Sequence, residues 1–128
     1  MRFPMPNHPC DFEIPDDWLA EAGMDGFIRK RSAYQSLAGA RLVPLVEIEP
    51  PKRNPAVVKD WRGFDRARMV SVLKGIAIGA EIPPVPLLEL PTGTCPFPAP
   101  YRCRVKDGFH RFYASVAAGF ECLPGAIV

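Results

Sequence analysis

Long hydrophobic runs are missing from this 128-residue sequence. Its uncharged apolar stretches, such as residues 75–80, fall far short of the roughly 20 residues that a membrane-spanning helix requires. The first ten residues, M-R-F-P-M-P-N-H-P-C, also lack the apolar run of a secretory signal. These absences predict a cytoplasmic protein that makes no contact with a membrane.

Paired cysteines and a strong excess of one charge are missing as well. The four cysteines show no C-x-x-C spacing, so we expect reduced thiols rather than disulfides. A zinc site built from His8, Cys10, Cys95 and Cys103 would have enough ligands but no recognisable spacing. The net charge of +2 is too close to neutral to indicate a general nucleic-acid surface. No Walker loop or internal repeat is present, so function must arise from a local arrangement of side chains.

Helix and strand patterns both occur, and the length fits one domain. Helix start and stop signals predict helices at about residues 16–22, from residue 65 to between 75 and 79, and at about 109–118. Strands are expected at residues 32–37, 40–51, 81–90 and 101–106, and the final segment, 120–128, should return to the sheet. The pattern predicts a small α+β fold.

Single residues refine this prediction. Pro44 cannot donate a hydrogen bond to a ladder, so the second expected strand should lie at an edge of the sheet or break there. Asp65 is a good N-cap for the second helix. Met69, Leu73 and Ile76 then follow the spacing of a buried helix face.

A histidine and an arginine stand where the third helix should disfavour them. Residues 106–113 read K-D-G-F-H-R-F-Y, which puts His110 and Arg111 in the first turn. That turn has unpaired N–H groups and a partial positive charge, and it disfavours a cation by up to about 1 kcal/mol.

The same first turn is suited to an anion. Free N–H groups converge after a strand and a tight Asp107-Gly108 turn, and an arginine fork fits phosphate oxygens. Gly108 has no side chain and lets the backbone approach a ligand closely. Alternatively, His110 and Arg111 are solvated or pair with an acid such as Asp107 or Glu47.

The segment V-K-D-G-F-H-R-F-Y-A-S-V-A-A-G-F-E-C-L-P-G-A-I-V combines a strand, a D-G-x-H-R turn and a helix that ends at a glycine. It resembles the signature region of the superfamily of ParB N-terminal domains and sulfiredoxins. Upstream, V-P-L-V-E-I-E-P-P, A-R-M-V-S-V-L-K-G-I and E-I-P-P-V-P-L-L-E-L are similar to its first strand, its helix and the strand that follows. The resemblance implies one ParB/sulfiredoxin-like domain at residues 42–128, with a small mixed sheet flanked by a few helices. Residues 1–41 match nothing in that superfamily and should form an N-terminal extension with a short helix, either packed on the domain or acting as a lid.

The resemblance also implies a ligand. The superfamily's turn holds nucleotide phosphates: ATP in sulfiredoxins, CTP in chromosome-partitioning ParB, and a nucleotide in related free-serine kinases. The positions that match its phosphate-binding turn and neighbouring helix are Asp107, Gly108, His110, Arg111, Arg68 and Ser71. The resemblance therefore implies a nucleoside phosphate, ATP or CTP, bound as a switch or as the substrate of phosphoryl transfer.

Catalysis is implied less directly. Glu47 stands near the position where the serine kinases keep an acidic base, and Mg²⁺ would be the expected co-ion. Phe109 occupies the position of the catalytic cysteine of sulfiredoxins, which excludes reductase chemistry by that route.

Two other classes of function stay open. A non-catalytic partner module, such as an antitoxin, an immunity protein or a regulatory subunit, would use apolar contact surfaces. Candidate contacts are Phe3, Phe12, Trp18, Phe97 and Tyr101, unless these aromatic side chains cover the domain's own core. A DNA-binding or nuclease protein would need more than the basic residues Lys52, Arg53, Lys59, Arg62, Arg66 and Arg68, for which a solvated or phosphate-facing surface is the expected role. We expect no DNA binding without an additional domain.

Overall fold

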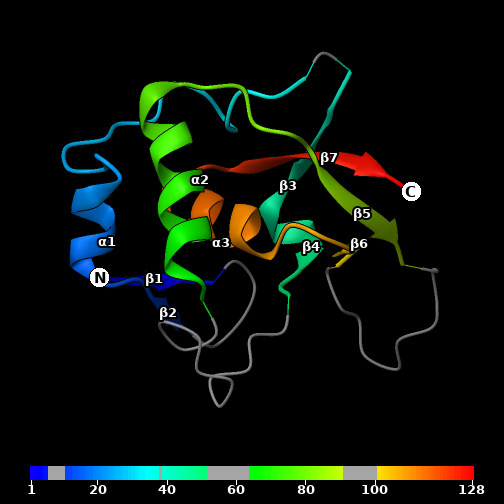
Figure 1. Ribbon diagram of the computed structural model, residues 1–128. Coiled ribbons are helices and arrows are strands. Elements are labelled where there is room, and N and C mark those ends of the chain that lie inside the picture. The colour runs from blue at the N-terminus through cyan, green and yellow to red at the C-terminus, as the bar shows by residue number, and fades with distance from the viewer. Residues whose placement is uncertain (6–10, 38, 52–63, 91–100) are drawn as a thin grey trace.

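The computed structural model describes residues 1–5, 11–37, 39–51, 64–90 and 101–128. In these ranges the chain forms a two-stranded hairpin, three α-helices and a curled five-stranded mixed sheet (Figure 1). The expected α+β fold with a small mixed sheet beside a few helices is confirmed.

Apart from the N-terminal hairpin, which the sequence did not predict, the helices and the strands of the sheet follow the predicted order. The hairpin pairs β1 (Arg2–Pro4) with β2 (Asp11–Glu13). The helices are α1 (Asp16–Glu21), α2 (Arg66–Ile78) and α3 (Phe109–Ala117). The sheet contains β3 (Arg41–Pro44), β4 (Ile48–Glu49), β5 (Val85–Glu89), β6 (Cys103–Val105) and β7 (Cys122–Ile127).

The strand predicted at residues 32–37 is wrong. The carbonyl groups of this segment accept isolated hydrogen bonds from two other segments, and no strand ladder forms. The Ser32 carbonyl oxygen accepts from the N–H groups of Glu121 and Cys122, at 3.0 and 2.8 Å. The Gln35 carbonyl oxygen accepts from the Ile82 N–H at 2.9 Å, just after α2. The segment therefore ties β7 to the connection before β5.

The sheet curls because its two edge strands are almost continuous in sequence. Its strand order is β3-β7-β5-β6-β4, yet only a single turn of 3-10 helix, Leu45–Glu47, separates β3 from β4. This turn bridges both sides, since the Leu45 N–H donates to the Glu121 carbonyl at 2.9 Å and the Glu47 carbonyl accepts from the Arg102 N–H at 2.7 Å. Pro44 was expected either to lie in an edge strand or to break its strand, and both are confirmed. Strand β3 is at the edge of the sheet, and it ends at Pro44.

Helix α2 begins and ends at the predicted signals. The Asp65 carboxylate accepts a hydrogen bond from the Arg68 N–H at 3.1 Å, and Gly79 closes the helix with a φ of 72°. Met69, Leu73 and Ile76 are buried as their spacing predicts. The helix therefore presents one apolar face to the core.

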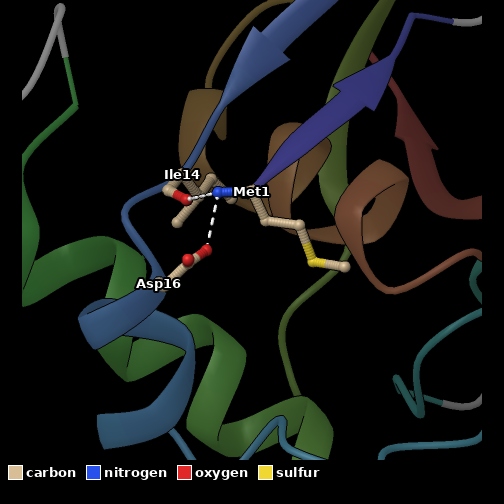
Figure 2. Close-up of polar contacts among 3 residues, drawn as sticks. All are labelled: Met1, Ile14 and Asp16. Carbon is tan, nitrogen blue, oxygen red and sulfur yellow. Dashed lines mark hydrogen bonds and ion pairs between the residues drawn. The ribbon is translucent and has the colours of Figure 1, made fainter.

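The N-terminal hairpin and α1 pack on the same core as the sheet. Phe12 and Trp18 are buried and Phe3 is half-buried, so these aromatic side chains cover the core rather than forming an exposed contact surface. The Met1 amino group donates to the Ile14 carbonyl at 2.7 Å and to the Asp16 carboxylate at 2.8 Å, which joins β1 to the start of α1 (Figure 2). A division of the chain into an extension and a domain at residue 42 stays a prediction.

Candidate functional site

The predicted turn at Asp107 and Gly108 lies between the end of β6 and the start of α3. Gly108 is buried and has a φ of 117°, a conformation that residues with a side chain rarely adopt. A Cβ atom added there would lie 3.0 Å from Cγ1 of Val85. The turn therefore fits tightly against the start of β5, and only glycine satisfies both constraints.

The first turn of α3 is left without a cap. Gly108 has no side chain to accept a hydrogen bond, and no acidic residue stands in this turn. Within the described part of the chain, no backbone carbonyl accepts from the N–H groups of Phe109 or Arg111. These two donors are therefore available to a ligand.

Arg111 folds back over the turn. Its Nη1 atom donates to the carbonyl oxygens of Pro83 and Pro84, at 3.1 and 2.9 Å. Its Nε and Nη2 atoms lie 3.2 Å from the position that a Cβ atom on Gly108 would occupy. No carboxylate pairs with Arg111 among the described residues, so neither of the two alternatives expected from sequence, full solvation or an acidic partner, applies to it.

Tyr34 shares this carbonyl cluster. Its hydroxyl donates to the Pro83 carbonyl at 2.8 Å. Burial raises the pKa of Tyr34 to about 12, and the Arg111 guanidinium opposes part of that rise. At neutral pH the Tyr34 hydroxyl is thus protonated and remains a hydrogen-bond donor.

His110 connects the two longer helices. Its Nε2 atom accepts a hydrogen bond from the Asp65 N–H at 3.0 Å. The ring also lies 5.1 Å from the Phe109 ring and 6.1 Å from the Phe64 ring, measured between centroids. This bond holds the N-terminus of α2 against the N-terminus of α3.

Arg68 and Ser71 both lie on the exposed side of α2. Ser71 lines a shallow hollow of about 520 Å³ beside α1, together with Glu21, Arg66 and Lys74. Arg68 does not line this hollow, and no ion pair involves its guanidinium among the described residues. No described contact joins Arg68 or Ser71 to His110 or Arg111.

Glu47 lies at the other end of β6. Its carboxylate is 3.2 Å from Nε of Arg102, just before β6 begins, whereas the Asp107-Gly108 turn follows the end of that strand. The structure therefore does not bring Glu47 to the turn, and its role as a base stays a prediction. Asp107 is exposed at the turn itself.

Sequence reasoning missed the groups that hold His110 and Arg111. The Asp65 N–H lies 45 positions before His110, and Pro84 lies 27 positions before Arg111. One local signal was available for the second contact. Pro83 and Pro84 have no backbone N–H group, so this segment cannot form a regular strand ladder. Their carbonyl oxygens therefore need hydrogen-bond donors from elsewhere in the chain.

Several expectations fall outside the described residues. The zinc ligands His8, Cys10 and Cys95 are among these positions, as are Lys52, Arg53, Lys59 and Arg62 of the basic cluster and Phe97 of the apolar set. Of the described basic residues, Arg66 pairs with Glu21 at 2.6 Å. In the described ranges no group of three or more His, Cys, Asp or Glu residues could hold a metal ion. No helix in those ranges is long and apolar enough to cross a membrane.

Cys103 is expected to be a slow nucleophile. Burial raises the pKa of its thiol and Glu89 raises it further, because a thiolate loses hydration there and faces a negative charge. Since one pKa unit lowers the thiolate fraction about tenfold, Cys103 should react with iodoacetamide more slowly than N-acetylcysteine at mildly alkaline pH. The difference should narrow as the pH rises. Mass spectrometry of the Cys103 peptide measures this rate, and an equal rate for the two thiols would contradict the expectation. Glu89→Gln should increase the rate.

Comparison of the chain with protein-family models, with curated proteins and with solved structures returned no match.

Proposed function

We propose that the junction of the N-termini of α2 and α3 binds the phosphate groups of a nucleotide. The observation that carries this proposal is the hydrogen bond of 3.0 Å from the Asp65 N–H to Nε2 of His110. It brings the N-terminus of α3, which has no side-chain cap and no acidic residue in its first turn, against the start of α2. The α2 end is already capped by the Asp65 carboxylate, so the partial charge of about +0.5 at the α3 end is what favours an anion there.

Arg111 supports the same ligand. Its Nη1 atom is held by two proline carbonyls, while Nε and Nη2 lie against the Gly108 turn. A guanidinium held in place loses little conformational freedom when it binds a phosphate, and its planar fork fits two oxygens at once. The carbonyl dipoles that hold Arg111 do not neutralise its charge.

The resemblance to ParB-like and sulfiredoxin-like domains supports a nucleoside triphosphate, ATP or CTP, as the ligand. Mg²⁺ would then be held mainly by the phosphates, since Mg²⁺ usually keeps waters and few protein ligands. Binding alone, as in a switch, fits the positions of the side chains better than phosphoryl transfer. The reason is that Glu47 pairs with Arg102 before β6, away from the turn.

Arg111→Ala is expected to weaken nucleotide binding at least tenfold, since a charged hydrogen bond contributes about 1.5–3 kcal/mol. Calorimetric titration with ATP, CTP, GTP and ADP, with and without Mg²⁺, measures the affinity. Arg111→Lys keeps the charge without the fork and should be intermediate. Arg104→Ala removes an exposed arginine that pairs with Glu49 at 2.7 Å, and it serves as the matched control.

The proposal fails if folded wild-type protein binds none of these nucleotides, or if Arg111→Ala binds as tightly as wild type. Circular dichroism and a thermal melt of each variant separate a loss of binding from a loss of fold. Release of inorganic phosphate or ADP during the same titration would favour phosphoryl transfer, and Glu47→Gln would then test the base.

A further inference from the structure

A second hollow, of about 330 Å³, lies at the C-terminal end of α2. It is lined by residues 27, 28, 30, 31 and 33–35, by residues 76–80 and by Phe120. The Phe27 and Phe120 rings meet edge to face within it, with centroids 6.3 Å apart. We call this hollow the α2 C-terminal cavity. It lies at the opposite end of α2 from the contact between Asp65 and His110. Tyr34 adjoins both places, because it lines the cavity and its hydroxyl donates to the Pro83 carbonyl that also accepts from Arg111.

The most exposed large apolar side chains of the described residues gather at this cavity. Ile28 is 80% exposed and Ile78 is 72% exposed, more than any other large hydrophobic side chain in that part of the chain, and both line the cavity. Scattered exposed apolar residues are ordinary on a protein surface, but two around one hollow form a patch. Covering both with an apolar group would remove this area from water.

The rim of the cavity is basic. In the described part of the chain, the charged residues that line the cavity are Lys30 and Arg31, and neither pairs with a carboxylate there. Their neighbour Arg29 differs, since it pairs with Glu121 at 2.9 Å. An occupant of the cavity would therefore face two positive charges that the protein itself does not balance.

The backbone beside the cavity also has unused hydrogen-bonding groups. Across the described ranges, no backbone–backbone hydrogen bond involves residues 28–31, although the Arg31 carbonyl accepts from Nη1 of Arg29 at 3.4 Å. A peptide that lies along this segment can pair with these N–H and C=O groups, as extended peptides do at exposed backbone.

We propose that the α2 C-terminal cavity binds an acidic peptide segment of a partner protein, which inserts one large apolar side chain between Ile28 and Ile78. A buried apolar anchor supplies most of the affinity at such contacts, and charges at the rim direct the choice of partner. Carboxylates beside the anchor would meet Lys30 and Arg31. A second copy of this chain fits less well, because a twofold contact would place the same basic rim on itself.

Selection of a random linear peptide library on immobilised wild-type protein tests this proposal. The selected peptides should share a large apolar residue flanked by Asp or Glu. Their affinity, measured by fluorescence anisotropy, should fall at least about tenfold in the double variant Ile28→Ser, Ile78→Ser, and Arg31→Glu should weaken binding separately. Leu42→Ser changes an exposed apolar residue on β3 and should leave binding unchanged.

Three outcomes would overturn the proposal. The first is a selection that yields no shared motif. The second is that the selected peptides bind the double variant and Arg31→Glu as tightly as they bind wild type. The third is a wild-type dimer in light scattering that Ile78→Ser converts to a monomer, since the occupant would then be a second copy of the chain. None of these outcomes depends on nucleotide binding, so failure here leaves the nucleotide proposal intact.

Discussion

Replacing Phe64 with alanine is expected to lower the free energy of unfolding by about 3–5 kcal/mol. The Phe64 side chain is fully buried, and its ring centroid lies 5.2 Å from that of Tyr113, 5.5 Å from that of Phe109 and 6.3 Å from that of Phe12. Alanine would remove these ring contacts and leave a cavity in the core. Urea denaturation followed by circular dichroism measures the change.

A graded series of variants shows whether the loss comes from this cluster. Phe64→Leu keeps part of the volume and should cost less than alanine. Phe3→Ala is the peripheral comparison, because Phe3 is half-buried and its closest ring neighbour is Phe12 at 5.4 Å. If Phe64→Ala and Phe3→Ala lower the free energy of unfolding equally, the ring contacts of Phe64 contribute no more to stability than those at the edge of the core. A total stability of about 5–15 kcal/mol is usual for domains of this size, so the expected loss is a large share of it.

Gly108→Ala is expected to cost about 2–4 kcal/mol, the sum of backbone strain at positive φ and overpacking. Gly108 has a φ of 117°, and an added Cβ atom would meet Cγ1 of Val85 at 3.0 Å. The matched control is Gly119→Ala, because Gly119 has a φ of 84° with no atom within 4 Å of an added Cβ. Gly119→Ala should therefore show the strain alone, at about 1–2 kcal/mol.

The difference between these two variants isolates the contact with Val85. If thermal or urea denaturation shows the same loss of stability for Gly108→Ala and Gly119→Ala, β5 moves away from the turn without a free-energy penalty. The double variant Gly108→Ala, Val85→Ala should recover part of the loss that comes from the contact, although Val85→Ala removes buried volume of its own.

Local signals predicted the helices well because caps and glycines act within a few residues. Asp65 and Gly79 bound α2 as expected, and the Asp107-Gly108 turn leads into α3 as expected. The strands were predicted less well, since pairing depends on partners that are distant in sequence. A pattern of alternation at 40–51 cannot reveal that Leu45–Glu47 forms a 3-10 turn where the sheet closes.

The candidate site shows the same limit. The sequence placed His110 and Arg111 in the first turn of α3, and the structure confirms that position. It could not show that His110 accepts a hydrogen bond from the Asp65 N–H, or that Arg111 donates to Pro83 and Pro84. These contacts are set by how α2, α3 and the connection to β5 pack, and no local spacing encodes that packing.

The curl of the sheet at the 3-10 turn also affects the tendency of the protein to associate with other copies of itself through its sheet edges. In the described part of the chain, the edge strands β3 and β4 have four and two residues, and β3 ends at a proline. Long flat edges with unpaired N–H and C=O groups are templates for strand addition and aggregation. Short edges that curl toward each other offer little of that template. We therefore infer that curling the sheet protects the protein against edge-to-edge association when it is crowded.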